Sequence, residues 1–362
     1  MFEIIQNNLV IGTPFDRDHT DIPFDQITYF ENIFNELKKY NQLYQNIKNQ
    51  KLKLIFMFKD AWATVNKFET HKQDSGNIMA LDLYNILYKA CEKEALLNNS
   101  LFVTSTNTDD VLQHADWPIY YFNEPFNRYF EYEHAVNISS KPFDKHFLWL
   151  NRRTRNHRLY ALHQAYKLKL FDDCIYTFHD YQCDIADHIS NLKQYLPKEK
   201  IDINFRKART KSNKLNSHYN IIQDEQEIKQ LISLKSWADS CYLEIVSEYL
   251  ASDYKVFHTE KTARSIVMGK PFIILGDKGS LQSLKRLGFK TFDSFWSEDY
   301  DNLPTAQERV DAALDVICDI RKNIDPKRGY SNSMLDIIRH NQNHYFKIYR
   351  KQQLDTYARI ME

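Results

Sequence analysis

Short apolar runs alternate with segments of helical spacing along most of this chain of 362 residues. In the second half, mostly apolar runs at residues 147–150, 174–178, 242–246 and 271–275 are separated by such segments. Runs of this length suit buried strands, and a helix between two strands lets them lie parallel. The alternation therefore predicts an α/β fold made of Rossmann-like strand–helix units.

The helices expected in this half connect the strands and continue beyond the last one. They cover about residues 154–169, 184–195, 224–235, 281–287, 305–323 and 334–361. The final segment is long and rich in Tyr, Lys and Arg. We expect it to pack back across the first domain.

The first part of the chain shows the same alternation. Helical spacing at residues 30–37 and 80–97 predicts helices, whereas apolar runs at 52–58, 101–105 and 119–122 predict strands. Small and turn-forming residues then interrupt the pattern shortly before residue 142. Because a single core rarely grows to this chain length, we expect two domains. Their expected limits are 1–142 and 143–330, with the terminal helix at 331–362.

Charge and cysteine content limit the class of protein. Lys plus Arg and Asp plus Glu both total 48, so no net charge attracts nucleic acid or an anionic membrane. No basic segment followed by an apolar core begins the chain, and no run has the length of a membrane span. We expect a cytoplasmic protein with reduced thiols, because the five cysteines are odd in number and contain no CxxC pair.

The segment from His258 to Ile266 carries the strongest functional signal. Thr259 is a capping residue, and Glu260 and Lys261 follow it where a helix is expected to begin, just before the strand at 271–275. Free N–H groups at a helix start, together with a lysine, suit a diphosphate. The same three residue types also begin many ordinary solvated helices, so the pattern alone leaves both interpretations open.

Residues 257–261, Phe-His-Thr-Glu-Lys, and the strand and glycine at 270–276 resemble the donor-site motif of the α-1,3-fucosyltransferase family. That family has Tyr-Val-Thr-Glu-Lys, a helix, and a Val-Pro-Val-Val strand followed by Gly. The chain is also similar to viral and phage glycosyltransferase-like proteins, which add a Gly-Ser-Leu run and Glu-x-Tyr-Asp. Here these are residues 279–292 and 298–301, and the resemblance covers about residues 145–310.

The resemblance implies a glycosyltransferase of the GT-B type, in which two Rossmann-like domains face a cleft. It implies that Lys261 contacts the donor diphosphate, that Glu260 contacts the ribose, and that Thr259 and Glu248 belong to the nucleotide-sugar site. Tyr249 and Phe257 depart from the family's Asn and Tyr. The donor need not be GDP-fucose, and the base and sugar stay open.

Arginines directly follow the strand at 147–150. The strand ends and the next helix begins at Arg152, Arg155 and Arg158. Guanidinium groups at such a position can form bidentate hydrogen bonds with phosphate oxygens. The alternatives are a solvated basic helix start and an arginine that pairs with carboxylates of the other domain. We expect Arg152, Arg155 and Arg158 to contribute to donor binding.

The general base that an inverting transfer requires cannot be assigned from the residues alone. Asp60 and Glu124 both follow strand-like runs and are candidates, with Asp16, Asp18 and His19 as a third group. Asp16 and Asp18 form an Asp-x-Asp triplet, and it lies in a polar stretch rather than after a strand. We therefore expect transfer without a metal ion or other cofactor, the donor being a nucleotide-sugar.

Two acceptors stay open. One is a glycan, and the other is a hydroxymethylated pyrimidine of viral DNA, which the basic patch at 206–214 favours. Because the chain as a whole is neutral, the patch by itself is more typical of a solvated, flexible loop. The alternative to an enzyme is a non-catalytic nucleotide-binding or scaffold module that keeps the fold.

Overall fold

The chain forms two compact units in the computed structural model. Unit 1 comprises residues 1–125 and 351–362, and unit 2 comprises residues 126–350. The structure describes residues 2–5, 7–12, 33–58, 63–64, 69–73, 76–105, 117–135, 137–138, 142–151, 156–178, 231, 234–253 and 256–362.

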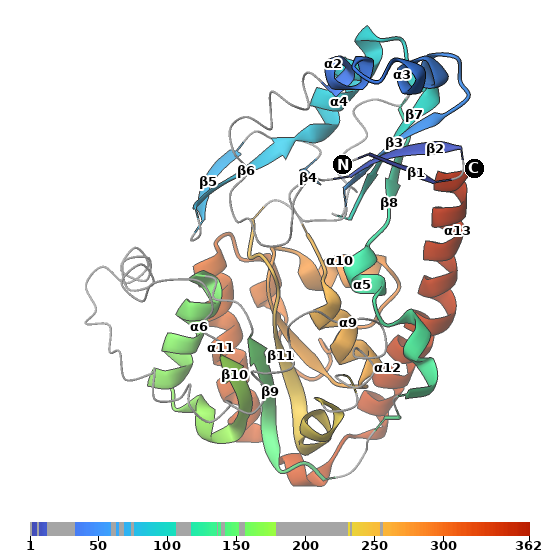
Figure 1. Cartoon of the computed structure of the whole chain (residues 1–362). Coiled ribbons are helices and arrows are strands. Elements are labelled where there is room, and N and C mark those ends of the chain that lie inside the picture. Colours follow the sequence, from blue (N-terminus) through green and yellow to red (C-terminus); the bar gives the residue numbers. More distant parts are fainter. Residues whose placement is uncertain are drawn as a thin grey trace. The chain divides into compact units, whose positions relative to one another are not determined.

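Unit 1 contains a five-stranded sheet in the order β1-β2-β3-β7-β8 (Figure 1). Its first two strands are antiparallel, and every other neighbouring pair is parallel. The strands are β1 (Phe2–Ile5), β2 (Asn8–Gly12), β3 (Lys53–Phe58), β7 (Ser100–Thr104) and β8 (Ile119–Tyr121). The expected strands at 52–58, 101–105 and 119–122 are therefore confirmed within one or two residues.

Helices and a small second sheet complete unit 1. The expected helix at 30–37 is present as α2, whereas the one at 80–97 begins only at Leu83, because residues 80–82 end a strand. The other elements are α2 (Ile33–Lys38), α3 (Asn41–Lys48), β4 (Ala63–Thr64), β5 (Glu69–Gln73), β6 (Gly76–Asp82) and α4 (Leu83–Lys93), and the short helix α5 (Glu124–Asn127) spans the division between the units.

Side chains on the two faces of the unit 1 sheet pack into separate clusters. On one face Phe102 meets Tyr84 at 5.4 Å between ring centroids, and Trp117 stacks on Tyr84 at 5.0 Å. The alternate residues of β7, Leu101 and Val103, pack on the other face with Val10, Ile55, Met57 and Ile360. Ile360 lies in the final helix, so the end of the chain completes this core.

Unit 2 contains a four-stranded parallel sheet in the order β10-β9-β11-β12. Its strands are β9 (Lys145–Asn151), β10 (Cys174–Phe178), β11 (Cys241–Ser247) and β12 (Phe272–Leu275). These elements confirm the four strands expected from the sequence. Parallel pairing buries both sheet faces, which agrees with the almost continuous burial of β11 and β12.

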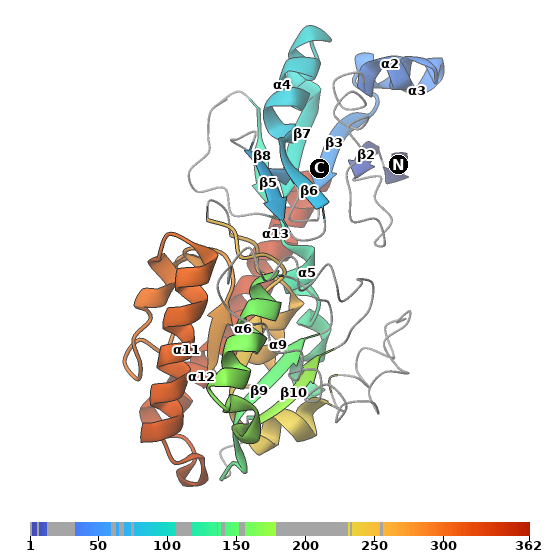
Figure 2. The same ribbon diagram turned by 90° about the vertical axis from the view of Figure 1, so that its left-hand side faces the viewer.

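Helices cover both faces of this sheet. In Figures 1 and 2, α6 and α11 lie together on one side, whereas α9 and α12 lie on the other. Tyr160 of α6 donates to Asp311 of α11 at 2.7 Å, which joins the first pair. The helices are α6 (Asn156–Lys167), α9 (Glu260–Val267), α10 (Ser280–Arg286), α11 (Ala306–Asn323) and α12 (Asn332–Asn343).

The C-terminal segment is helical from residue 332 to 361, as the sequence predicts. It passes from α12 through a π-helix, η7 (His344–Tyr349), into α13 (Arg350–Met361). The part up to residue 350 belongs to unit 2, and the remainder belongs to unit 1.

The division between the units falls after Pro125, earlier than the boundary expected near residue 142. The reason is aromatic packing, since Phe126 and Phe130 join the core of unit 2. Tyr345 donates to the carbonyl of Phe126 at 2.6 Å, and its ring lies 5.1 Å from that of Phe130. The described residues next to the expected boundary, 137–138 and 142–143, therefore lie within unit 2 instead of separating the units.

The mixed α/β class with parallel sheets is thus confirmed. Within the part of the chain that the structure describes, no helix combines the length and apolar character needed to cross a bilayer.

Candidate functional site

The order of strands in unit 2 identifies one place for a ligand. From β9 the chain turns through α6 to β10 on one side, whereas from β11 it turns through α9 to β12 on the other. The connections therefore diverge between the carboxyl ends of β9 and β11. In open parallel sheets, ligands bind at this type of topological switch point. Asn151 ends β9, Ser247 ends β11, and Glu248 follows directly.

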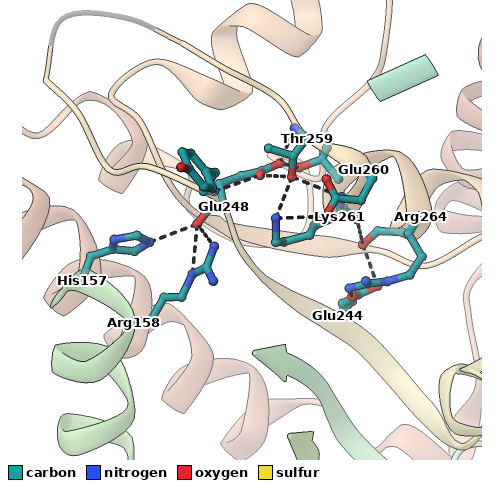
Figure 3. A network of polar contacts seen from close by, with 11 residues as sticks. His157, Arg158, Glu244, Glu248, Thr259, Glu260, Lys261 and Arg264 are labelled. Atoms are coloured by element: carbon teal, nitrogen blue, oxygen red, sulfur yellow. Dashed lines mark hydrogen bonds and ion pairs between the residues drawn. The ribbon is translucent and has the colours of Figure 1, made fainter. Parts of the chain in front are cut away.

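The carboxylate of Glu248 is buried at this point and accepts several hydrogen bonds (Figure 3). Oε1 accepts from the backbone N–H of Thr259 at 3.1 Å and from the Thr262 hydroxyl at 2.6 Å. Oε2 accepts from the Thr259 hydroxyl and from the N–H of Tyr249 at 3.3 Å. Glu248 therefore attaches the start of α9 to the end of β11.

Thr259 caps α9, as the sequence predicts. Its backbone is extended, and its hydroxyl oxygen accepts from the backbone N–H of Lys261 at 3.3 Å, so the helix begins at Glu260. The ammonium group of Lys261 also donates to that oxygen at 3.0 Å and lies 3.3 Å from Oε1 of Glu260. The three motif residues thus lie at one helix terminus in mutual contact.

Glu260 and Lys261 are the partly exposed members of this cluster, with 30% and 14% of their side chains accessible. Burial raises the pKa of Glu260, but the charges of Lys261, Arg128 and Arg264 outweigh it and lower that pKa to about 2. Burial lowers the pKa of Lys261, and the nearby carboxylates of Glu260 and Glu248 oppose this shift. Glu260 is therefore ionised at neutral pH and partly compensates the local positive charge.

Arg158 and His157 approach the same point from α6 (Figure 3). The buried guanidinium of Arg158 donates to the carbonyl oxygen of Glu248 through Nε at 3.1 Å and Nη2 at 2.5 Å. Nε2 of His157 lies 3.1 Å from the same oxygen, so its N–H tautomer donates to it. One residue, Glu248, thus links α6 through its backbone and α9 through its side chain.

His258, next to the cap, is buried against Phe126, with 5.8 Å between ring centroids. Burial lowers the pKa of His258 to about 4, although Glu248 raises it. The imidazole is therefore neutral at physiological pH and adds no positive charge to the cluster.

The structure brings together five of the residues expected in the donor site. These are Arg158, Glu248, Thr259, Glu260 and Lys261. Arg152, Arg155 and Asp60 lie outside the described residues, as do Asp16, Asp18, His19 and the basic patch at 206–214. Glu124 is the first residue of α5, three residues after β8 ends at Tyr121.

Asn151 and His157 were not among the residues predicted for the site. Asn151 is 1% exposed, and its backbone N–H donates to the Thr177 hydroxyl oxygen at 3.1 Å. A polar amide at the end of an apolar strand is the signal that could have identified it. His157 gave no such signal, because its contact with Glu248 joins residues far apart in sequence.

No protein-family model matches this chain, and no curated protein matches it. Among the residues that the structure describes, no group of three or more His, Cys, Asp or Glu side chains is arranged to hold a metal ion.

Proposed function

We propose that the protein is a glycosyltransferase and that unit 2 binds the nucleotide-sugar donor between the carboxyl ends of β9 and β11. The observation that carries this proposal is the convergence of Arg158, Glu248 and the Thr259–Lys261 helix start on one topological switch point. The resemblance of residues 257–261 to a glycosyltransferase donor motif supports the same site.

The proposed chemistry is stabilisation of a leaving nucleoside diphosphate. When the glycosidic bond breaks, negative charge develops on the diphosphate, and fixed positive groups lower the barrier most when they are already in place. Lys261 and the first turn of α9 supply such groups, and Glu248 holds that turn through Thr259. Glu260 would accept a hydrogen bond from a ribose hydroxyl.

The architecture that fits this chemistry is the GT-B arrangement, with unit 1 on the acceptor side. A base in unit 1 would remove the proton of the attacking hydroxyl, and Asp60 and Glu124 remain the candidates. Lys261, one or more of Arg152, Arg155 and Arg158, and the helix dipole would replace a metal ion in this scheme. The acceptor would be a glycan or a hydroxymethylated pyrimidine of viral DNA, and retention on duplex DNA that falls with salt would favour the second.

A thermal-shift screen of nucleoside diphosphates and nucleotide-sugars tests the proposal. A ligand present at a hundred times its Kd stabilises the native state by about 2.7 kcal/mol, which gives a measurable rise in Tm. Lys261→Ala should abolish most of this rise, while Lys322→Ala, an exposed lysine of α11, should keep it.

Turnover separates an enzyme from the alternative. Hydrolysis or transfer of the bound sugar supports a transferase, whereas binding of UDP or GDP without turnover of any donor indicates a non-catalytic nucleotide-binding module. Equal ligand stabilisation in wild type and Lys261→Ala would contradict the proposed site.

A further inference from the structure

Asn151 carries a buried side-chain amide that makes no hydrogen bond to the described residues. Neither Oδ1 nor Nδ2 has a hydrogen-bond partner within the described part of the chain, although the residue is only 1% exposed. Its backbone groups are engaged, since its N–H donates to Thr177 and its carbonyl accepts from the same hydroxyl at 3.3 Å. Buried polar atoms are paired in most native proteins, so an unused amide requires an explanation.

Asn341 in α12 shows how this chain treats an asparagine with a purely structural role. It is 2% exposed, its Oδ1 accepts from the N–H of Lys290 at 2.7 Å, and its Nδ2 donates to the carbonyl of Lys290 at 2.8 Å. The two asparagines are similarly buried, yet among the described residues only Asn341 has a partner at each end of its amide.

The groups beside Asn151 are already committed to other partners. Trp149, two residues earlier on the same face of β9, donates from Nε1 to the Ser247 hydroxyl at 2.8 Å. The Thr177 hydroxyl contacts the backbone of Asn151. Neither the Trp149 indole nor the Thr177 hydroxyl can therefore turn to the amide without giving up the bond it makes.

The position of Asn151 connects it to the proposed donor site. It is the last residue of β9, at the switch point where β9 lies beside β11. Side chains alternate along β11, so Ser247 lies on the face opposite Glu244, whose side chain contacts α9 as that of Glu248 does. The Trp149–Ser247 bond puts Asn151 on the Ser247 side. A ligand at the switch point would meet the Glu248–Lys261 cluster on one face and Asn151 on the other.

We infer that the side-chain amide of Asn151 contacts a neutral part of the donor, either its base or its sugar, and not its diphosphate. The inference rests on the proposed function. A primary amide presents one acceptor and two N–H donors, whereas phosphate oxygens only accept. A diphosphate would therefore leave Oδ1 unsatisfied. The edge of a nucleobase with adjacent N–H and C=O groups, or a sugar hydroxyl, satisfies both ends.

Matched asparagine-to-leucine variants test this inference, because leucine keeps the number of side-chain atoms and removes the hydrogen bonds. Calorimetric titration with UDP, GDP, their sugar conjugates and pyrophosphate would be combined with urea unfolding of the ligand-free protein. Asn151→Leu should lower affinity for the nucleotide ligand at least tenfold, change pyrophosphate affinity less than twofold, and leave the urea midpoint unchanged or higher. Asn341→Leu should lower the midpoint and keep the affinity.

Comparing the ligands shows which neutral part of the donor Asn151 contacts. Equal losses for the nucleoside diphosphate and its sugar conjugate would assign Asn151 to the base or ribose, whereas a loss confined to the conjugate would assign it to the transferred sugar. If Asn151→Leu does not fold, Asn151→Ala must show the same selective loss of affinity.

Two results would overturn the inference. The first is wild-type affinity of Asn151→Leu or Asn151→Ala for every ligand that the wild type binds, which would leave the proposed function standing. The second is a drop in the urea midpoint of Asn151→Leu comparable to that of Asn341→Leu, with affinity unchanged. Failure of the wild-type protein to bind any nucleotide or nucleotide-sugar would instead refute the proposed function itself.

Discussion

Two regions along β11 hold a buried glutamate, and they compensate its charge in different ways. Glu244, in the middle of the strand, is completely buried and forms an ion pair with Arg264, while Ser265 donates to its other oxygen at 2.7 Å. Glu248, just beyond the strand, accepts only from hydroxyl and backbone N–H groups among the contacts described above. Both carboxylates face α9, one turn of the helix apart.

The difference separates a structural ion pair from a site with charge left for a ligand. Arg264 pairs with Glu244 inside the protein, and because Arg264 is itself buried, its charge is not presented to a ligand. At Glu248 the nearest lysine, Lys261, donates to the Thr259 hydroxyl and keeps 14% of its side chain accessible. The same helix thus neutralises one carboxylate fully and presents a cation beside the other.

Removing the cation at the first region should have the largest effect. Arg264→Met leaves Glu244 as an uncompensated buried charge, so the free energy of unfolding should fall by about 3–5 kcal/mol in urea titrations. The double variant Glu244→Leu/Arg264→Met should recover most of that loss. A loss below about 1 kcal/mol in the single variant would mean that the pair is not closed as described.

Replacing Glu248 should lower the free energy of unfolding by less than replacing Arg264. Glu248→Gln keeps the size of the side chain but turns one acceptor into a donor that faces Thr259 or Thr262, so we expect a loss of about 1–3 kcal/mol. Thr262→Val removes only the hydrogen bond from the Thr262 hydroxyl to Glu248, so its free energy of unfolding should fall by less. Nucleotide affinity should fall in Glu248→Gln as the start of α9 shifts, and an unchanged affinity would separate Glu248 from the ligand site.

Acid titration should show a smaller effect at Glu260. The pKa of Glu260 is about 2 in the folded protein against an ordinary value of 4.5, so its contribution is complete above about pH 4.5 and disappears as pH falls towards 2. Because 30% of the side chain is accessible, we expect about 1 kcal/mol. The difference in unfolding free energy between wild type and Glu260→Gln, measured from pH 6 to pH 3, should shrink on acidification.

The smallest change in stability should come from Lys261→Met. Methionine replaces a cation here as it does at Arg264, which lies three residues further along α9. Lys261, however, is partly exposed, and it contacts the Thr259 hydroxyl and the partly exposed carboxylate of Glu260. We expect the unfolding free energy to change by no more than about 0.5 kcal/mol, while nucleotide binding is lost. A fall of several kcal/mol in the unfolding free energy would mean that Lys261, like Arg264, has a structural role.

Much of unit 2 could be predicted because its local signals and its tertiary structure agree. The strand at 174–178 has the predicted bounds, and the capping chemistry of Thr259 predicted the first residue of α9. Unit 1 gave weaker signals. The strand Glu69–Gln73 is polar throughout, and Ala80, Leu81 and Asp82 fit a helix as well as the strand they form.

The remaining features of the site depend on contacts between residues far apart in sequence. The bonds from Arg158 to the carbonyl of Glu248 span 90 positions, and no local pattern indicates them. Periodicity likewise predicts that β9 is buried but not that the amide of Asn151 goes without a partner. The sequence therefore located the motif at Thr259–Lys261. Only the fold shows that it lies near Arg158 of α6 and near the end of β9.

Translation of unit 1 begins before that of unit 2 and is completed after it. Its core includes Ile360, and Asn8 of β2 donates to the carbonyl of Met361 at 2.8 Å. At about 5–20 residues per second, translation separates these two contributions by roughly 20 to 70 s. During that interval all of unit 2 is translated, while Val10, Ile55 and Val103 lack the packing partner that α13 supplies. This apolar face of the unit 1 sheet therefore stays incomplete until Ile360 has been added.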